Sequence, residues 1–186
     1  MSQPLITGIS SMATRALLTE LTAACGQPVA MESVGGVDAA KRVAAGEAFD
    51  VVVLASDAID KLIAAGRVLA GSKVDLVHSG VAVAVKAGAA HPDIASENAV
   101  KRAVLNASTL GYSTGPSGVQ LAKLFERWGI AQEIAPRIVT APPGVPVGAL
   151  VARGQVALGF QQLSELMNLQ GIEVLGPLPP AIQITT

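Results

Sequence analysis

Residues 39–56 read AAKRVAAGEAFDVVVLAS and contain a helical segment, a glycine turn and an apolar run, in that order. The Ala-rich part is typical of a helix from Asp38 to Ala45. The run from Val51 to Leu54 is typical of a buried parallel strand, because all of its residues are apolar. A second helical pattern follows from Ala58 to Ala65. Helix, strand and helix in this order predict a βαβ architecture with a mainly parallel sheet.

The same alternation continues through most of the chain and predicts an α/β fold. We expect strands at Leu5–Ile9, Val29–Val34, Val51–Leu54, Leu110–Tyr112, Ile138–Ala141, Ala157–Phe160 and Glu173–Leu175. We expect helices at Ser11–Ala24, Asp38–Ala45, Ala58–Ala65, Glu97–Leu105, Gly118–Trp128, Val147–Arg153 and Leu163–Met167. The helix that ends at Trp128 has the clearest pattern, because its apolar residues recur at helical spacing and Gly129 stands where a C-cap glycine belongs.

One region interrupts the alternation and suggests two lobes. Ser79 to Val85 is a long apolar run without a helix, which is typical of a strand that crosses between lobes. After Lys86 the βαβ pattern resumes. We therefore predict a first lobe over residues 1–78, a second lobe over residues 79–175, and a strand at 176–186 that returns toward the first lobe.

Composition argues against two classes of partner. The 186 residues are 51% hydrophobic but only 3% aromatic, and 13 basic residues against 14 acidic ones give a net charge of −1. Nucleic acid is not an expected partner, because there is neither a run of Lys and Arg nor a set of aromatic platforms. We expect no membrane span, because the apolar runs are far shorter than the roughly 20 residues that a membrane helix needs.

The N-terminus and the single cysteine bear on the compartment. The first residues, MSQP, show no basic segment followed by an apolar one. We expect a periplasmic protein if a signal peptide has been removed, and a cytoplasmic protein otherwise. Cys25 is the only cysteine, so an intrachain disulfide is impossible, and its place on the face of Leu17, Leu18 and Leu21 predicts burial.

Three loops place serine or glycine between the end of a strand and the start of a helix, where backbone N–H groups and the positive helix end attract anions. The residues concerned are Ser10 and Ser11, Gly35 and Gly36, and Ser113, Ser117 and Gly118. The third loop is the strongest candidate, because a helix cap needs one hydroxyl and residues 112–118 supply four. The structural alternative is that these serines are ordinary N-caps and that the paired glycines make a tight turn.

Two further positions could face the same ligand. Val147 begins a helix after the loop that starts at Pro142, and Gln161 follows the strand that ends at Phe160. A glutamine just past a strand is more often exposed to solvent than functional. We therefore include Gln161 as a candidate whose alternative is a solvent-facing side chain.

Catalytic and metal-binding patterns are absent from the sequence. His78 and His91 are the only imidazoles, and no carboxylate is spaced to form a triad or a metal set with either of them. No GxSxG, Walker A or HExxH motif is present. Asp57 at a helix start is more typical of a structural role. We expect no catalytic residue, no metal and no cofactor.

Taken together, these segments resemble the type II periplasmic solute-binding proteins, and among them the molybdate-binding proteins and their organic-acid-binding relatives. Residues 39–56 resemble the helix, glycine turn, Asp, strand and alcohol-bearing loop of that family, and residues 115–118 resemble its second-lobe anion loop. The chain departs from the molybdate binders in two places. Gln161-Gln162 stands where they usually carry a tyrosine, and Gly35-Gly36 replaces a serine-rich loop. These changes favour a larger, carboxylate-bearing ligand.

The resemblance implies the two-lobe fold, an anion in the cleft between the lobes, and delivery to an ABC transporter permease. It also implies closing helices beyond residue 186, which we expect either to be missing by truncation or to be supplied by a partner chain, as in a homodimer. A related branch is similar to aconitate isomerase. The leading hypothesis is thus an anion-binding protein without covalent chemistry. The alternatives are an isomerase of a tricarboxylic acid, with Tyr112, Glu165 or a serine as base, and a scaffold that binds no anion.

Overall fold

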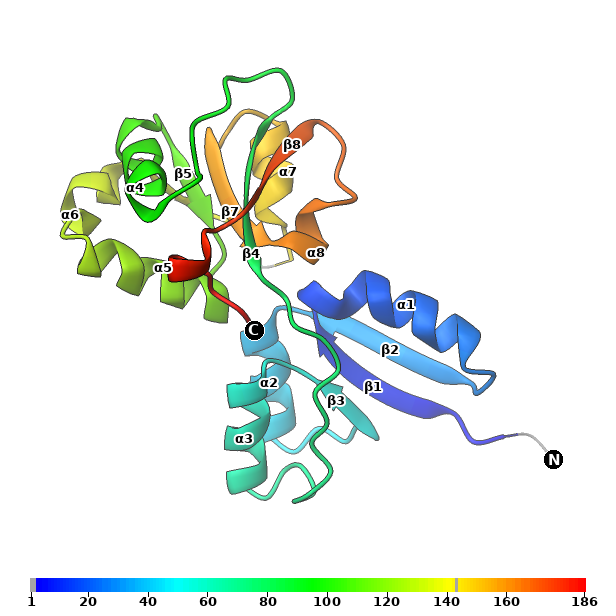
Figure 1. Ribbon diagram of the computed structural model, residues 1–186. Coiled ribbons are helices and arrows are strands. Elements are labelled where there is room, and N and C mark those ends of the chain that lie inside the picture. The colour runs from blue at the N-terminus through cyan, green and yellow to red at the C-terminus, as the bar shows by residue number, and fades with distance from the viewer. Residues whose placement is uncertain (1–2, 143) are drawn as a thin grey trace. The chain divides into compact units, whose positions relative to one another are not determined.

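The computed structural model describes residues 3–142 and 144–186, and the chain divides into two compact units, Met1–Val77 and His78–Thr186. Pro143, in the loop before Val147, lies outside the described residues. Each unit has its own sheet with helices against it (Figure 1). Among the described residues, every helix is too short or too polar to pass through a bilayer.

The first unit contains a three-stranded sheet. Its strands are β1 (Ile6–Ser11), β2 (Val29–Val34) and β3 (Val51–Val53), in the order β2-β1-β3, and both pairs are parallel. The helical segments are η1 (Met12–Thr14), α1 (Arg15–Ala24), α2 (Gly36–Ala44) and α3 (Ser56–Ala64). The predicted order of strands and helices over this unit is confirmed.

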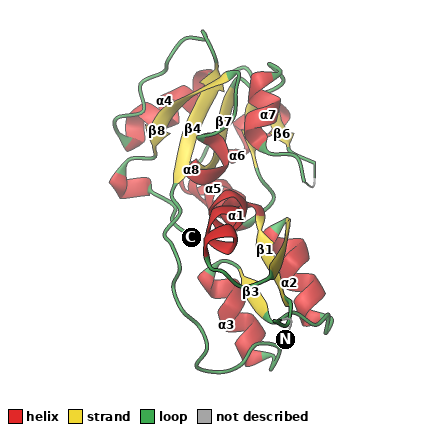
Figure 2. Ribbon diagram, turned by 90° about the vertical axis from the view of Figure 1, so that its right-hand side faces the viewer, coloured by secondary structure: helices red, strands yellow, loops and turns green. Residues whose placement is uncertain are grey.

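Helices cover both faces of this sheet, as Figures 1 and 2 show from two directions. The core forms where α2 and α3 pack on β1, with Ile9, Ala39, Val43 and Leu62 buried. On the other face, α1 buries only Leu18, while Leu17 and Leu21 remain exposed. Cys25 follows α1 and is exposed as well, so the prediction that it is buried was wrong: Leu17 and Leu21, on the helix face where it was placed, are exposed too.

The second unit contains a five-stranded mixed sheet, with the order β6-β5-β7-β4-β8. Its strands are β4 (Val81–Lys86), β5 (Leu110–Tyr112), β6 (Ile138–Thr140), β7 (Leu158–Gln162) and β8 (Ile172–Pro177). Strands β5, β6 and β7 are parallel, while β4 is antiparallel to both β7 and β8. Figure 2 shows β8, β4 and β7 side by side in yellow.

Two layers of helices sandwich this sheet. The helical segments are α4 (Glu97–Asn106), α5 (Pro116–Arg127), α6 (Ala131–Ile134), η2 (Ala135–Arg137), α7 (Val147–Ala152), α8 (Leu163–Leu166) and η3 (Pro180–Ile182). One face packs on α4, α5 and α6 around Phe125, which also contacts the rings of Tyr112, Trp128 and Phe160. The other face packs on α7 and α8. Gly129 has φ 70°, as a C-cap glycine after α5 requires.

The last residues of the chain belong to the second unit. Gly80 forms a bridge with Thr185, and the Ser79 and Thr186 backbones exchange hydrogen bonds of 2.8 and 2.9 Å. A short helix, η3, takes the place of the middle of the strand expected at 176–186. That residues 176–186 return toward the first lobe stays a prediction.

Candidate functional site

The carboxyl ends of three strands of the second unit leave the sheet at one edge. In the parallel pairing, Tyr112 of β5 lies opposite both Thr140 of β6 and Phe160 of β7. The next residues along the chain are therefore neighbours, and they include Ser113 and Gln161. This edge of an open α/β sheet is where ligands usually bind. We call it the second-unit edge.

The loop after β5 and the start of α5 form the centre of the second-unit edge. Gly115 is the N-cap of α5, Pro116 is its first residue, and no side chain caps this end. Ser117 is buried, with only 6% of its surface exposed, and its Oγ lies 3.4 Å from the Oγ of Ser113. The two hydroxyls, for which capping was the structural alternative, are bonded to each other, and the start of a twelve-residue helix is left without a side-chain acceptor.

Gly118 is needed at this point for a steric reason. A Cβ added to Gly118 would stand 1.6 Å from the backbone oxygen of Ser113. No side chain can fit there without movement of the backbone. The loop therefore folds directly over the first turn of α5, and it does so because residue 118 has no Cβ.

Helix α4 of the same unit, unlike α5, has a side-chain cap at its start. The Oγ of Ser96 accepts the N–H of Ala99 at 3.2 Å and so caps α4 in the ordinary way. The chain therefore uses a serine cap on α4, while the serines around α5 are placed differently. Among the described helices α4 is the one with a side-chain cap, so the uncapped start of α5 is shared with α1, α2 and α3, and what distinguishes α5 is the buried Ser117 against Ser113.

Beside the loop after β5, Gln161 forms a buried bridge between two elements. Its Oε1 accepts the N–H of Gly148 at 3.2 Å, and its Nε2 donates to Oε2 of Glu165 at 2.6 Å. Gln161 is only 3% exposed, so the solvent-facing alternative was wrong: β7 continues for two residues past Phe160 and holds both glutamines inside. Burial raises the pKa of Glu165 above its ordinary value, although the hydrogen bond from Gln161 acts in the opposite direction.

Val147 contributes to the core at this edge. Its side chain is fully buried among Ala141, Leu150 and Val151. Any contact between Val147 and a ligand would therefore use its backbone. Gln162 is also buried; its amide nitrogen donates to the hydroxyl of Thr186.

The first unit has a comparable edge, where β1 and β2 end. Ser10 is fully buried and its Oγ lies 2.7 Å from the Oγ of Ser33 on β2. Ser11, half-buried, makes no side-chain cap, and a Cβ placed on Gly36 would lie 3.5 Å from its Cβ. Gly35 is the N-cap of α2, again without a side-chain cap. The hydroxyl of Ser10 therefore links β1 to β2, whereas Ser11 lies next to the start of α2.

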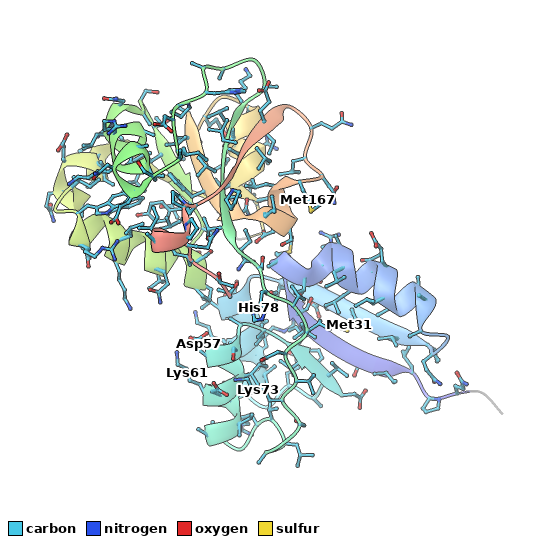
Figure 3. The ribbon with its side chains drawn as sticks, in the orientation of Figure 1. Met31, Asp57, Lys61, Lys73, His78 and Met167 are labelled. Atoms are coloured by element: carbon cyan, nitrogen blue, oxygen red, sulfur yellow. The ribbon has the colours of Figure 1, made fainter. Side chains whose placement is uncertain are left out.

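Two sets of charged groups elsewhere have structural partners. Figure 3 labels Asp57 and Lys61 on α3, whose side chains form an exposed ion pair of 3.3 Å. His91 bonds to Glu173, whose pKa is lowered mainly by the N–H of Gly88 and then by His91. Among residues 3–142 and 144–186, no three His, Cys, Asp or Glu side chains are grouped as a metal would require.

The chain matches the pattern of a known family over residues 6–186, and the description of that family is bacterial extracellular solute-binding protein. The chain belongs to this family. An aconitate isomerase from a Pseudomonas species is 42% identical over 146 residues, which cover 78% of this chain. The matched region is 55% of the isomerase, so this chain spans about half the length of that relative.

Solved structures of the same fold include oxyanion-binding proteins. The periplasmic molybdate-binding protein of Azotobacter vinelandii superposes with a TM-score of 0.71 and 18% identity, over 97% of this chain and 81% of that one. The tungstate-binding protein of Desulfovibrio alaskensis superposes with a TM-score of 0.57 and 13% identity, over 96% and 83%. The predicted periplasmic-binding-protein fold is therefore confirmed. At these identities the likeness concerns the fold alone.

Proposed function

We propose that the chain binds a small carboxylate-bearing anion at the second-unit edge. The observation that carries the proposal is the start of α5, where no side chain caps the helix and the buried Ser117 lies against Ser113. A helix start carries about half a positive charge, so neutral N–H and O–H groups can hold an anion there without Lys or Arg. Ser10, Ser11, Gly35 and Gly36 of the first unit stay predicted ligand contacts.

Two observations support a carboxylate over a metal oxyanion. The relative with 42% identity is named for a tricarboxylate, aconitate. In addition, a partly buried carboxyl group, Glu165, lies one hydrogen bond away from the candidate residue Gln161. A carboxyl group next to an anion must be protonated to avoid repulsion, and it can then share its proton with a carboxylate of the ligand.

The family supports a transport role and a location outside the cytoplasm. We propose that the chain acts in the periplasm and delivers its ligand to an ABC transporter permease, as expected for an extracellular solute-binding protein. A homodimer is a further proposal, which sedimentation of the purified chain at several concentrations would test.

A second candidate function is isomerisation of aconitate, favoured by the identity to aconitate isomerase. The reaction needs a group that removes a proton from the methylene carbon beside the double bond. The electron pair then shifts the double bond, and the same proton returns to the former vinyl carbon. Atoms and electrons balance without a cofactor. Glu165 suits this role better than Tyr112, because burial raises the pKa of Tyr112 and moves it further from neutrality.

Calorimetric titration tests the binding proposal. We expect trans-aconitate or citrate to bind at one site per chain, and sulfate and molybdate to bind more weakly. At a free ligand concentration of 100 times Kd, binding should stabilise the fold by about 2.7 kcal/mol, which a thermal shift detects. Absence of heat and of a thermal shift with all four anions would contradict the proposal.

Proton NMR separates the two functions. The chain is incubated with trans-aconitate, and the vinyl proton signal of the cis isomer is followed over time. Binding without a new signal supports the solute-binding function, and a signal that grows with enzyme concentration supports isomerisation.

A further inference from the structure

The carboxyl group of Glu165 is held in one orientation by a chain of two hydrogen bonds. Gly148 donates its N–H to Oε1 of Gln161, which fixes the amide so that its Nε2 donates to Oε2 of Glu165, at 2.6 Å. An amide whose oxygen already accepts a backbone N–H cannot flip without losing that bond. Among the described residues, Gln161 is the hydrogen-bond partner of Glu165. The other carboxyl oxygen of Glu165, Oε1, has no hydrogen-bond partner among them.

Within the described part of the second unit, no charged side chain lies beside Glu165. Of the strands and helices packed on α8 and its neighbours, β7 and α7 contain no titratable side chain, β4 contains Lys86 and β8 contains Glu173. Lys86 is five residues along β4 from the end where α8 begins, roughly 16 Å at the rise of a strand. Glu173 pairs with Val85 near that far end and is bonded to Gly88 and His91. Titration of Glu165 is therefore set by its burial and by Gln161.

We propose that Glu165 takes up one proton when an anion binds at the second-unit edge, and that this proton is shared with a carboxylate of the ligand. The inference rests on the proposed function and adds to it the residue that selects a carboxylate. Its geometric basis is the position of Gln161: it follows Phe160, the β7 partner of Tyr112, as Ser113 follows Tyr112. Through Gln161, Glu165 is thus bonded to the second-unit edge, on the face of the sheet that packs on α7 and α8.

Proton uptake makes the affinity depend on pH in a defined direction. Burial already raises the pKa of Glu165, and a bound anion raises it further, because a nearby negative charge disfavours the ionised form. Above the pKa of the free protein, the apparent affinity for the anion should fall about tenfold for each unit of pH. Below that pKa the affinity should be constant until the ligand itself becomes protonated.

The test is calorimetric titration of the whole chain with trans-aconitate between pH 5.5 and 8, in two buffers of different ionisation enthalpy, neither of them phosphate. The difference in heat between the buffers gives the number of protons taken up. For the natural sequence we expect about half a proton per anion bound at the pKa of Glu165 in the free protein, and about one proton at a pH well above that pKa.

Glu165→Gln is the decisive variant, because glutamine has the shape of a protonated carboxyl group and cannot titrate. At the lowest pH it should bind within about threefold of the natural sequence, with no proton uptake and without the tenfold loss per pH unit. Glu133→Gln, on the exposed surface of α6, makes the same chemical change away from the edge and should keep both the proton uptake and the pH dependence.

Stability measured without ligand tests whether the pKa of Glu165 is raised in the folded protein. A carboxyl group with a raised pKa in the folded state contributes stability that is complete below the unfolded pKa and is lost as the pH rises through the folded pKa. The Glu165→Gln variant should therefore lose less stability on going from pH 4 to pH 8 than the Glu133→Gln control does in urea denaturation.

The outcomes are distinguishable. Binding of trans-aconitate with equal heats in both buffers, or proton uptake that persists in Glu165→Gln, overturns the role of Glu165 and leaves the anion site standing. No binding by the natural sequence at any pH overturns the proposed function and this inference together.

Discussion

Gly118→Ala is expected to destabilise the second unit by about 3 kcal/mol or more and to abolish anion binding. The added methyl group would stand 1.6 Å from the backbone oxygen of Ser113 and 3.2 Å from the ring of Tyr112. The backbone oxygen cannot rotate away as a flexible side chain could. Either α5 or the loop after β5 must move, and both hold the groups proposed to bind the anion. Urea denaturation followed by tryptophan fluorescence measures the effect, since Trp128 lies in this unit.

Gly36→Ala is the matched control for stability. Gly36 also stands in the first turn of a helix after a parallel strand, but its added methyl group would meet only the Cβ of Ser11, at an ordinary contact distance of 3.5 Å. A Gly to Ala change in a compatible helical position usually stabilises a protein by about 0.4–1 kcal/mol. If Gly118→Ala were as stable as Gly36→Ala, the close approach over α5 would not exist in solution.

Most of the strands and helices could be predicted from the spacing of their apolar residues. Short continuous apolar runs mark the strands, and apolar residues at helical spacing mark the helices. Val29–Val34 and Leu110–Tyr112 match the observed strands at both ends, and α5 begins at Pro116, two residues before the predicted start. The end of β7 could not be found in this way. Gln161 and Gln162 are polar by composition, and only their hydrogen bonds to Gly148, Glu165 and Thr186 show why they can be buried.

The candidate site could be predicted as loops, but the role of each side chain could not. Small polar residues after a strand are visible in the sequence. That Ser10 is buried depends on Ser33, which lies directly opposite it in the parallel register of β1 and β2. The pairing of Ser10 with Ser33 could not be predicted from the sequence, because the register between two strands depends on the whole sheet and cannot be read from one segment. Glu165 likewise could be proposed as a base because it is a carboxylic acid. Its hydrogen bond to Gln161 is visible only in the structure.

The strongest test of the site is Gly115→Asp, which we expect to weaken anion binding by a hundredfold or more while leaving the fold intact. Gly115 is the N-cap of α5 with φ −75°, and a Cβ there would meet only Ser113 Oγ, at 3.5 Å. Aspartate is among the best N-caps and is a few tenths of a kcal/mol better than glycine. Its carboxylate would occupy the N–H groups proposed for the ligand, and two unit charges about 4 Å apart near a protein surface repel by about 4 kcal/mol.

Two companion variants separate charge from capping. Gly115→Asn caps the helix without a charge and should weaken binding by only about tenfold, which corresponds to about 1.4 kcal/mol. Ser96→Ala removes the existing cap of α4 and should cost about 1 kcal/mol of stability with no change in affinity. Affinity for trans-aconitate and the urea midpoint are measured on all three. The start of α5 would be an ordinary helix end, and the anion would bind elsewhere, if Gly115→Asp bound as tightly as Ser96→Ala.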